Sequence, residues 1–316
     1  MAENRRSEQA RRGYLAAFGA TLFLATTAIF IRYLSVNFQL PALVLTFWRE
    51  LFTALAVLIV LLLTRRQAVK MPVGQFLFLV GYGLVLAAFN GTWALSVALN
   101  GASVATVMAY SSAAFTAVLG WLLLGEKLDA LKIAALMLSI AGITLVVNVF
   151  DRSAWLLTPS GLAAGLVAGF TYAGYSLMGR AAANRGISAW TSLLYAFFFA
   201  SILMLAANLL AGRYLPGGAR IPADLLWLGT AWDGWLVLLI LAAVPTLLGF
   251  GLYNVSLQHL PASVANLVLT VEPVFTAIIA YLLFWEMLQG VQILGSTLIL
   301  CGVFLLRFRK LEADQK

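Results

Sequence analysis

The sequence has very few charged residues. Asp, Glu, Lys and Arg make up 10% of its 316 residues, whereas 63% are apolar. A soluble domain carries about 25% charged and 45–50% apolar residues, so these charges are too few to cover a soluble surface. Together with a mean hydropathy of +0.97, this composition indicates an all-α polytopic membrane protein.

Cysteine and histidine occur once each, as Cys301 and His259. One cysteine excludes an intramolecular disulfide, and one histidine excludes an HExxH or other multi-histidine metal site. The sequence also has no Walker A motif for nucleotide phosphates, no G-x-S-x-G and no clustered carboxylates for acid–base catalysis. We therefore expect no cofactor, no metal and no enzyme activity.

The sequence contains one long stretch twice. Residues 102–146 recur without a gap as residues 262–306, at a shift of 160 positions, and 15 of the 45 aligned residues are identical. Ser103-Val104-Ala105 returns as Ser263-Val264-Ala265, and Glu126 returns as Glu286. The shift is close to half the chain length, so the repeat predicts a duplication of the whole fold.

Ten apolar runs are each near the ~20 residues that cross a hydrocarbon core. They lie at about 14–34, 42–63, 73–97, 102–124, 130–149, 160–179, 188–211, 234–257, 262–285 and 289–306. Asn100-Gly101 is the tight joint between the third and fourth runs.

The distribution of Lys and Arg predicts the orientation. With the N-terminus in the cytosol, 15 of these residues fall on the inner side and 4 on the outer side, as the positive-inside rule requires. This topology accounts for the net charge of +8 without nucleic acid as a partner. We expect both termini in the cytoplasm.

Five spans per repeat is an odd number, so the second repeat must insert upside down relative to the first. Inverted repeats are typical of secondary transporters that work by alternating access. The expected organisation is an N-terminal tail (1–13), a first repeat (14–149), an external linker (150–159), a second repeat (160–306) and a C-terminal tail (307–316).

The repeated stretch resembles the EamA domain of the drug/metabolite transporter superfamily. The residues that carry the resemblance are the A-S-V-A start, Glu272-Pro273 within a span, the E-K-L or E-M-L that closes it, and the last helix from Gly295 to Val303. The resemblance implies ten helices around a central cavity and an exporter of amino acids or other metabolites in the inner membrane of a prokaryote. In the first copy Ser112-Ala113 replaces Glu272-Pro273, so we expect the acid and the kink to occur once.

Glu272 lies near the middle of its span, and a charge at that depth is costly and marks a functional site. Pro273 cannot donate a backbone hydrogen bond and is expected to kink the helix. A carboxyl group held there can exchange a proton or pair with a substrate ammonium group. The alternative is a Glu-Pro pair that only shapes the kink.

Arg49 and Glu50 are the other charges within a span. Neighbouring residues point about 100° apart on a helix, so one is expected to face the bundle while the other extends outward. We favour a structural role for them, tying their helix to a neighbour, over contact with the substrate.

Polar and aromatic residues of the central spans are the candidates for substrate binding, because aromatic walls with a few polar groups suit an amphipathic organic molecule. These candidates are Tyr82, Asn90, Trp93, Tyr110, Tyr172, Tyr175, Asn254 and Gln258.

The favoured function is a secondary transporter for small organic metabolites, with efflux of amino acids, including aromatic ones, ahead of other substrates. Uptake or facilitated diffusion of another metabolite, or movement of lipid by the same fold, are the alternatives. The expected partners are a small-molecule substrate and the bilayer. A monomer is expected, while Gly161, Gly165 and Gly169, spaced four apart, leave a dimer as the alternative.

Overall fold

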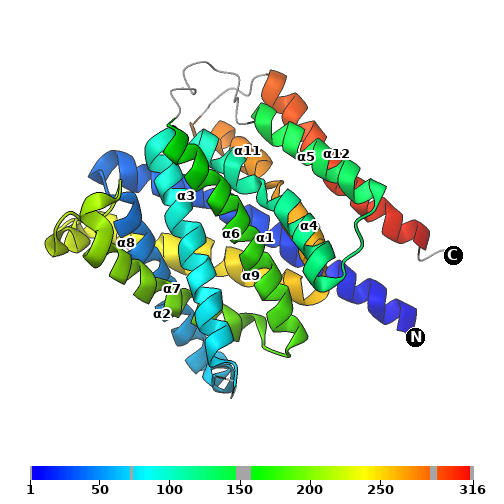
Figure 1. Ribbon diagram of the computed structural model, residues 1–316, viewed down its shortest axis with the longest axis horizontal. Helices are drawn as coiled ribbons and strands as arrows, with labels where there is room; N and C mark the ends of the chain where they lie inside the picture. Colours follow the sequence, from blue (N-terminus) through cyan, green and yellow to red (C-terminus); the bar gives the residue numbers. More distant parts are fainter. Residues whose placement is uncertain (1, 72–73, 147–157, 285–289, 314–316) are drawn as a thin grey trace.

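The computed structural model describes residues 2–71, 74–146, 158–284 and 290–313, and these residues form helices and connecting turns without a β-strand (Figure 1). The α-helices are α1 (Ala2–Phe38), α2 (Ala42–Thr64), α3 (Phe76–Tyr110), α4 (Ser112–Leu124), α5 (Ala130–Val146), α6 (Pro159–Asn184), α7 (Ala189–Ala211), α8 (Trp232–Leu241), α9 (Leu247–His259), α10 (Ala262–Leu269), α11 (Glu272–Phe284) and α12 (Gly290–Ala313). Short helical turns are η1 (Arg66–Val69), η3 (Gly212–Tyr214), η4 (Pro222–Leu226) and η5 (Ala242–Thr246).

The predicted spans are found as apolar helices. Among the residues that the structure describes, eight helical segments are long and apolar enough to cross a membrane, and shorter apolar helices lie at Ala130–Val146 and Gly290–Leu305. Helix α1 also runs through the predicted tail at residues 1–13, beginning at Ala2. Most of the predicted linker at 150–159 lies outside the described residues.

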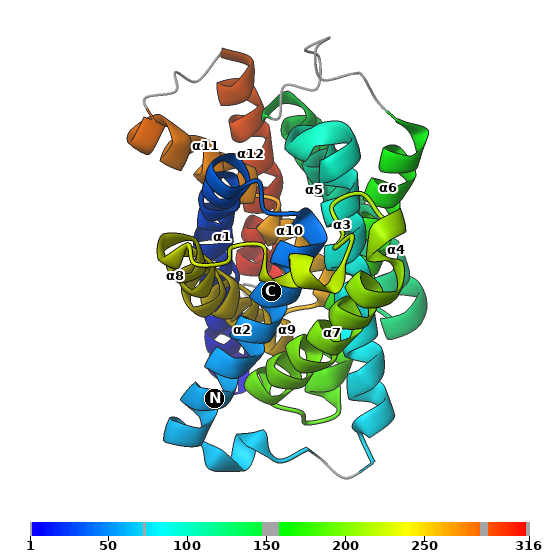
Figure 2. The ribbon, with the colours of Figure 1, turned by 90° about the vertical axis from the view of Figure 1, so that its left-hand side faces the viewer.

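Helices α5 and α12 lie side by side at one edge of the bundle, opposite α2, α7 and α8 (Figures 1 and 2). They are equivalent elements of the two repeats and they pack antiparallel. A Cβ on Gly142 would lie 2.5 Å from the Gly295 carbonyl oxygen, and a Cβ on Gly302 would lie 2.7 Å from that of Ala135.

These two contacts are equivalent under the repeat. Adding 160 to 142 gives 302, and adding 160 to 135 gives 295, so both contacts join the same two repeat positions. A pair of contacts that exchange partners in this way is the mark of a two-fold axis. The axis relates antiparallel spans, so the two repeats have opposite orientations. The predicted inverted duplication is therefore present in the structure.

Helix α3 contains a reversal of the chain close to the predicted joint at Asn100-Gly101. A Cβ on Gly165 of α6 would lie 2.6 Å from Cβ of Met108 and 2.8 Å from Oγ of Ser96. In a straight helix these two residues would be about 18 Å apart along the axis. The chain therefore turns back between Asn100 and Val104, and both arms pack on α6.

The expectation of a single kink was wrong. The second copy breaks between α10 and α11, where the N–H groups of Thr270 and Val271 bond to carbonyls three residues back. The first copy breaks at the equivalent position between α3 and α4, without a proline. There the Ser111 hydroxyl donates to the Met108 carbonyl oxygen (2.5 Å), which is how serine competes with the regular backbone ladder.

The span predicted at 234–257 is also interrupted, by the wide π-helical turn η5. Pro245 has no N–H to donate to the carbonyl of Leu241, four residues earlier. The Thr246 hydroxyl donates to that carbonyl oxygen instead (2.8 Å), and Thr53 of α2 donates to Ala242 (3.3 Å). This turn sets the direction in which α9 enters the centre of the bundle.

Candidate functional site

A cavity lies at the centre of the bundle, between the two repeats. Its volume, counted as space open to the centre of a water molecule, is about 100 Å³, whereas one water needs roughly 10–15 Å³ by that measure. It therefore has room for several waters or for a small organic molecule. The lining residues are Leu24, Thr27, Arg49, Phe89, Asn90, Trp93, Thr106, Ala109, Tyr110, Tyr172, Phe250 and Glu272.

Arg49 and Glu50 are both buried, so the expectation that one of them extends outward was wrong; their exposed fractions are 4% and 0%. They are joined through Asn90 of α3. Arg49 donates from Nη2 to Asn90 Oδ1 (2.9 Å), and Asn90 donates from Nδ2 to Glu50 Oε1 (2.8 Å). Taking two charges out of water is costly unless each is paired and hydrogen-bonded, and the shared amide links α2 to α3 at this depth.

Glu272 is the first residue of α11, directly after the break in the second repeat. Its side chain is partly buried and lines the cavity, as does the side chain of Tyr110. The N-terminus of a helix favours a negative charge. Pro273, the next residue, is buried in the first turn, where the lack of an N–H costs nothing.

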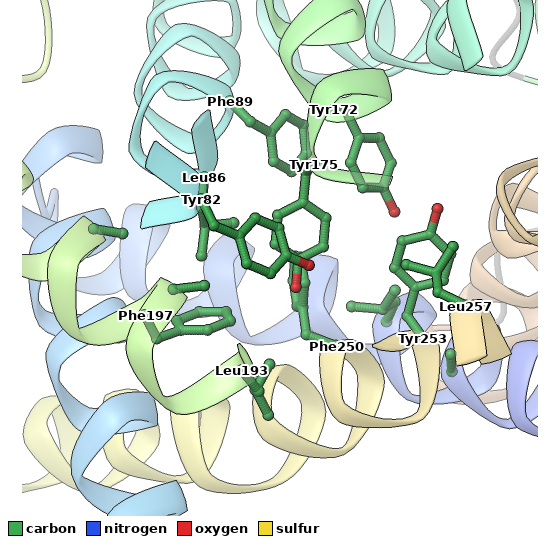
Figure 3. Packing of buried hydrophobic residues seen from close by; sticks show 14 of the residues in the cluster. Tyr82, Leu86, Phe89, Tyr172, Tyr175, Leu193, Phe197, Phe250, Tyr253 and Leu257 are labelled. Carbon is green, nitrogen blue, oxygen red and sulfur yellow. The ribbon is translucent and has the colours of Figure 1, made fainter. Parts of the chain in front are cut away.

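Aromatic rings form a large part of the cavity wall. Phe89 of α3 and Tyr172 of α6 stack face to face, with ring centroids 4.3 Å apart and planes 7° apart (Figure 3). Trp93 lies one helical turn beyond Phe89, and Phe250 of α9 contributes a further ring. The polar groups of the cavity therefore stand among apolar surfaces, as in sites for amphipathic small molecules.

Next to this wall, Tyr82, Tyr175 and Asn254 form a buried layer. The sequence predicted them as substrate-binding residues, but they do not line the cavity. Asn254 Oδ1 accepts hydrogen bonds from Tyr82 (3.0 Å) and from Tyr175 (3.2 Å), and the two rings stack at 4.7 Å. Next to them the hydroxyl groups of Tyr253 and Ser176 are 2.6 Å apart.

The layer lies toward one end of the bundle. Tyr82 precedes Asn90 by two turns of α3, while Tyr175 and Tyr253 each follow a cavity residue by about one turn (Figure 3). All three tyrosines have exposed fractions of 0%. The layer therefore closes the cavity at the end where α3 begins and where α6 and α9 terminate.

Gln258 does not line the cavity either. It is partly buried, and its Nε2 donates to the carbonyl oxygen of Ile187 between α6 and α7 (3.3 Å). The sequence reasoning also missed several lining residues: Leu24, Thr27, Phe89, Thr106, Ala109 and Phe250. Thr27 and Thr106 are polar residues within apolar runs, and this was a signal that could have found them.

The cavity thus combines a cationic group, a carboxyl group, an amide and aromatic surfaces. Arg49 supplies planar donors suited to a carboxylate, and Glu272 supplies acceptors. The described residues contain no group of three or more His, Cys, Asp or Glu side chains that would hold a metal ion. The arrangement is suited to binding an organic molecule that carries charges, within a polytopic helical membrane protein built of two inverted repeats.

The comparisons with known proteins agree with this description. The chain matches the EamA-like transporter family over residues 11–148 and 159–308, and it belongs to that family. It is therefore an integral membrane protein of the transporter class. The match covers each repeat once.

Relatives of this chain occur in bacteria. It is 26% identical over 240 residues to a probable amino-acid metabolite efflux pump of Salmonella typhimurium, covering 75% of this chain and 78% of that protein. It is 28% identical over 240 residues to a protein of the same description from Escherichia coli, covering 73% and 78%. A solved crystal structure with 16% identity has a TM-score of 0.75 and covers 95% of this chain and 98% of its own, which shows the same fold.

Proposed function

We propose that this protein is a secondary transporter that exports amino acids, including aromatic ones, or closely related metabolites by alternating access. It acts in the inner membrane of a prokaryote with both termini in the cytoplasm. Its partners are the small-molecule substrate and the surrounding lipid, and it acts as a monomer.

The observation that carries the proposal is the position of the cavity between the inverted repeats. The wall takes Arg49, Phe89 and Tyr110 from the first repeat and Tyr172, Phe250 and Glu272 from the second. Exchange of conformations between two similar halves would open such a cavity first to one side and then to the other. The buried tyrosine layer would then be the closed end.

The substrate class is supported by the cavity and by the relatives. Relatives named as probable amino-acid metabolite efflux pumps cover about three quarters of the chain. An amino acid carries a carboxylate and an ammonium group, and the cavity presents Arg49 and Glu272. Aromatic rings beside them suit an apolar or aromatic side chain.

Coupling to protons, if the transport is active, would pass through Glu272. It is a carboxyl group in the cavity wall, at the break between α10 and α11. A change in its protonation would therefore alter the packing of these two helices. Tyr110 lines the same cavity, and a tyrosine hydroxyl can donate or accept a hydrogen bond.

The test is a flux assay in proteoliposomes with a panel of labelled amino acids, with and without a pH gradient. We expect at least one amino acid to accumulate against its concentration gradient in the wild type, and Glu272→Gln to move it only down that gradient. The control is Asp233→Asn, because Asp233 is exposed at the start of α8 and lies outside the cavity.

Absence of flux for every amino acid would contradict the proposed substrate class. Accumulation that is the same in Glu272→Gln and the wild type would contradict proton coupling through this residue and leave the transporter class intact.

A further inference from the structure

The two charged residues of the cavity wall come from different repeats and are held in different ways. Arg49 belongs to α2 of the first repeat, and Glu272 begins α11 of the second. Both line the same cavity, and the wall around them is largely aromatic and aliphatic. The question is which chemical group each of them faces.

Arg49 has a hydrogen-bond donor that the described residues leave unused. Asn90 accepts from Nη2, and through Asn90 the side chain is tied to Glu50. Its Nε has no hydrogen-bond partner among the residues that the structure describes, although the side chain is 4% exposed. A buried donor without a partner is unfavourable, and a planar guanidinium matches a carboxylate through two parallel hydrogen bonds.

Glu272 offers the complementary group. Its carboxyl group lines the cavity, and an ionised carboxylate has about four acceptor positions. An ammonium group has three donors and no acceptor. The acceptor positions of Glu272 therefore suit a substrate ammonium group.

We propose that Arg49 and Glu272 form a clamp that reads both charges of a zwitterionic α-amino acid. Arg49 binds the α-carboxylate, Glu272 receives the α-ammonium group, and the side chain lies against Phe89, Tyr172 and Trp93. Asn90 and Glu50 are positioning residues that orient the guanidinium. This inference rests on the proposed function and deepens it.

The clamp gives a specificity that an aromatic cavity alone does not give. A molecule that lacks either charge leaves the Glu272 carboxyl group or the unused Arg49 donor without a partner in the occupied cavity, which is unfavourable. A site built to pair with a group rejects the analogue that lacks it far better than an apolar pocket rejects a change of size. Amines and simple carboxylic acids of the same shape are therefore poor ligands.

The test uses three ligands of one shape: phenylalanine, 2-phenylethylamine and 3-phenylpropionate. Their affinities are measured by competition with labelled phenylalanine, or by calorimetry, on the full chain in nanodiscs. We expect the wild type to prefer phenylalanine over each analogue by on the order of tenfold or more.

The variants should give a crossed pattern. Glu272→Gln should lose most of its preference over 3-phenylpropionate, which lacks the ammonium group, and keep its preference over 2-phenylethylamine. Arg49→Gln should do the opposite. Arg49→Lys keeps the charge without the planar fork, so it should weaken phenylalanine and 3-phenylpropionate and leave 2-phenylethylamine unchanged. This lowers only the preference over the amine, and the variant serves if Arg49→Gln does not fold.

Matched controls are Asp233→Asn and Arg213→Gln, at exposed positions outside the cavity, and both should leave all ratios unchanged. Equal weakening of the three ligands in Glu272→Gln and Arg49→Lys would overturn the clamp and leave amino-acid transport standing. If no amino acid binds or moves in the wild type, the proposed substrate class fails, and the clamp fails with it.

Discussion

The carboxylate of Glu126 binds the N-terminus of α10, and so joins the two repeats. It accepts hydrogen bonds from the backbone N–H groups of Ala262 (2.6 Å) and Ser263 (3.2 Å), and from the Ser263 hydroxyl. Lys132 Nζ donates to Ser263 Oγ (2.8 Å) and lies 3.9 Å from the carboxylate. An anion at this position also interacts favourably with the helix dipole.

This contact lies beyond the tyrosine layer, at the same end of the bundle, so we predict that it holds that end closed. Hydrogen bonds to a charged group contribute about 1.5–3 kcal/mol each, and about 1.4 kcal/mol is tenfold in an equilibrium. In Glu126→Gln we expect a cysteine at Ser176 to react at least about tenfold faster with a membrane-impermeant thiol reagent.

The measurement uses inverted membrane vesicles and a Cys301→Ser background, which removes the native cysteine. Glu8→Gln is the control, because Glu8 is an exposed carboxylate paired with Arg12 (2.8 Å). An unchanged labelling rate in Glu126→Gln would show that the contact does not close this end. The equivalent residue of the second repeat, Glu286, lies outside the described residues.

The antiparallel contact of α5 and α12 predicts equal effects at equivalent glycines. A Cβ at Gly142 or Gly302 would meet backbone atoms of the opposite helix, and overpacking of this kind costs about 1–3 kcal/mol. Gly142→Ala and Gly302→Ala should each lower the melting temperature by on the order of 5 °C. Gly290→Ala, with nothing within 4 Å of the new Cβ, should not. A large effect at only one of the two would contradict an equivalent role.

The architecture could be predicted because it depends on features visible in a single chain. An apolar run of sufficient length must cross the membrane, and a repeat of five spans must invert. The breaks at Ser111 and at Ala242–Thr246 were missed for different reasons. Ser111 acts through a side-chain hydrogen bond that leaves no mark in the hydropathy, whereas Pro245 was visible in the sequence and was not used.

The candidate site could be predicted only in part, because the rotation of each helix about its axis depends on its neighbours. Tyr82 and Tyr175 look like cavity residues in sequence, but Asn254 lies between their hydroxyl groups and draws them into a buried layer. Phe89 was not among the sequence candidates, yet it stacks on Tyr172 in the wall. The sequence predicted a structural role for Arg49 and did not place it in the wall, because its orientation depends on Asn90, from another helix.

The role of Asn254 predicts an order of stability among substitutions in the layer. Tyr82→Phe removes one hydrogen bond, which costs about 0.5–1.5 kcal/mol. Asn254→Ala leaves the hydroxyl groups of both Tyr82 and Tyr175 buried without their acceptor, at about 1–3 kcal/mol each. Thermal unfolding in detergent should therefore rank Asn254→Ala well below Tyr82→Phe. Asn37→Ala, at an exposed site, is the control, and equal losses in the two layer variants would contradict the shared acceptor.

The stacked pair of Phe89 and Tyr172 predicts a change of substrate preference. Aromatic pairs contribute about 0.5–1.5 kcal/mol beyond the area they bury, and removal of one ring leaves the substrate ring without that partner. Phe89→Ala should weaken binding of phenylalanine by roughly 3- to 10-fold and change binding of alanine little, because alanine has no ring to place there. The matched control is Phe170→Ala, since Phe170 is an exposed ring that packs edge-on against Phe115 away from the cavity. The measurement is competition binding with both amino acids. If Phe89→Ala loses affinity equally for phenylalanine and alanine, the ring supports the cavity as a whole and does not contact the substrate side chain.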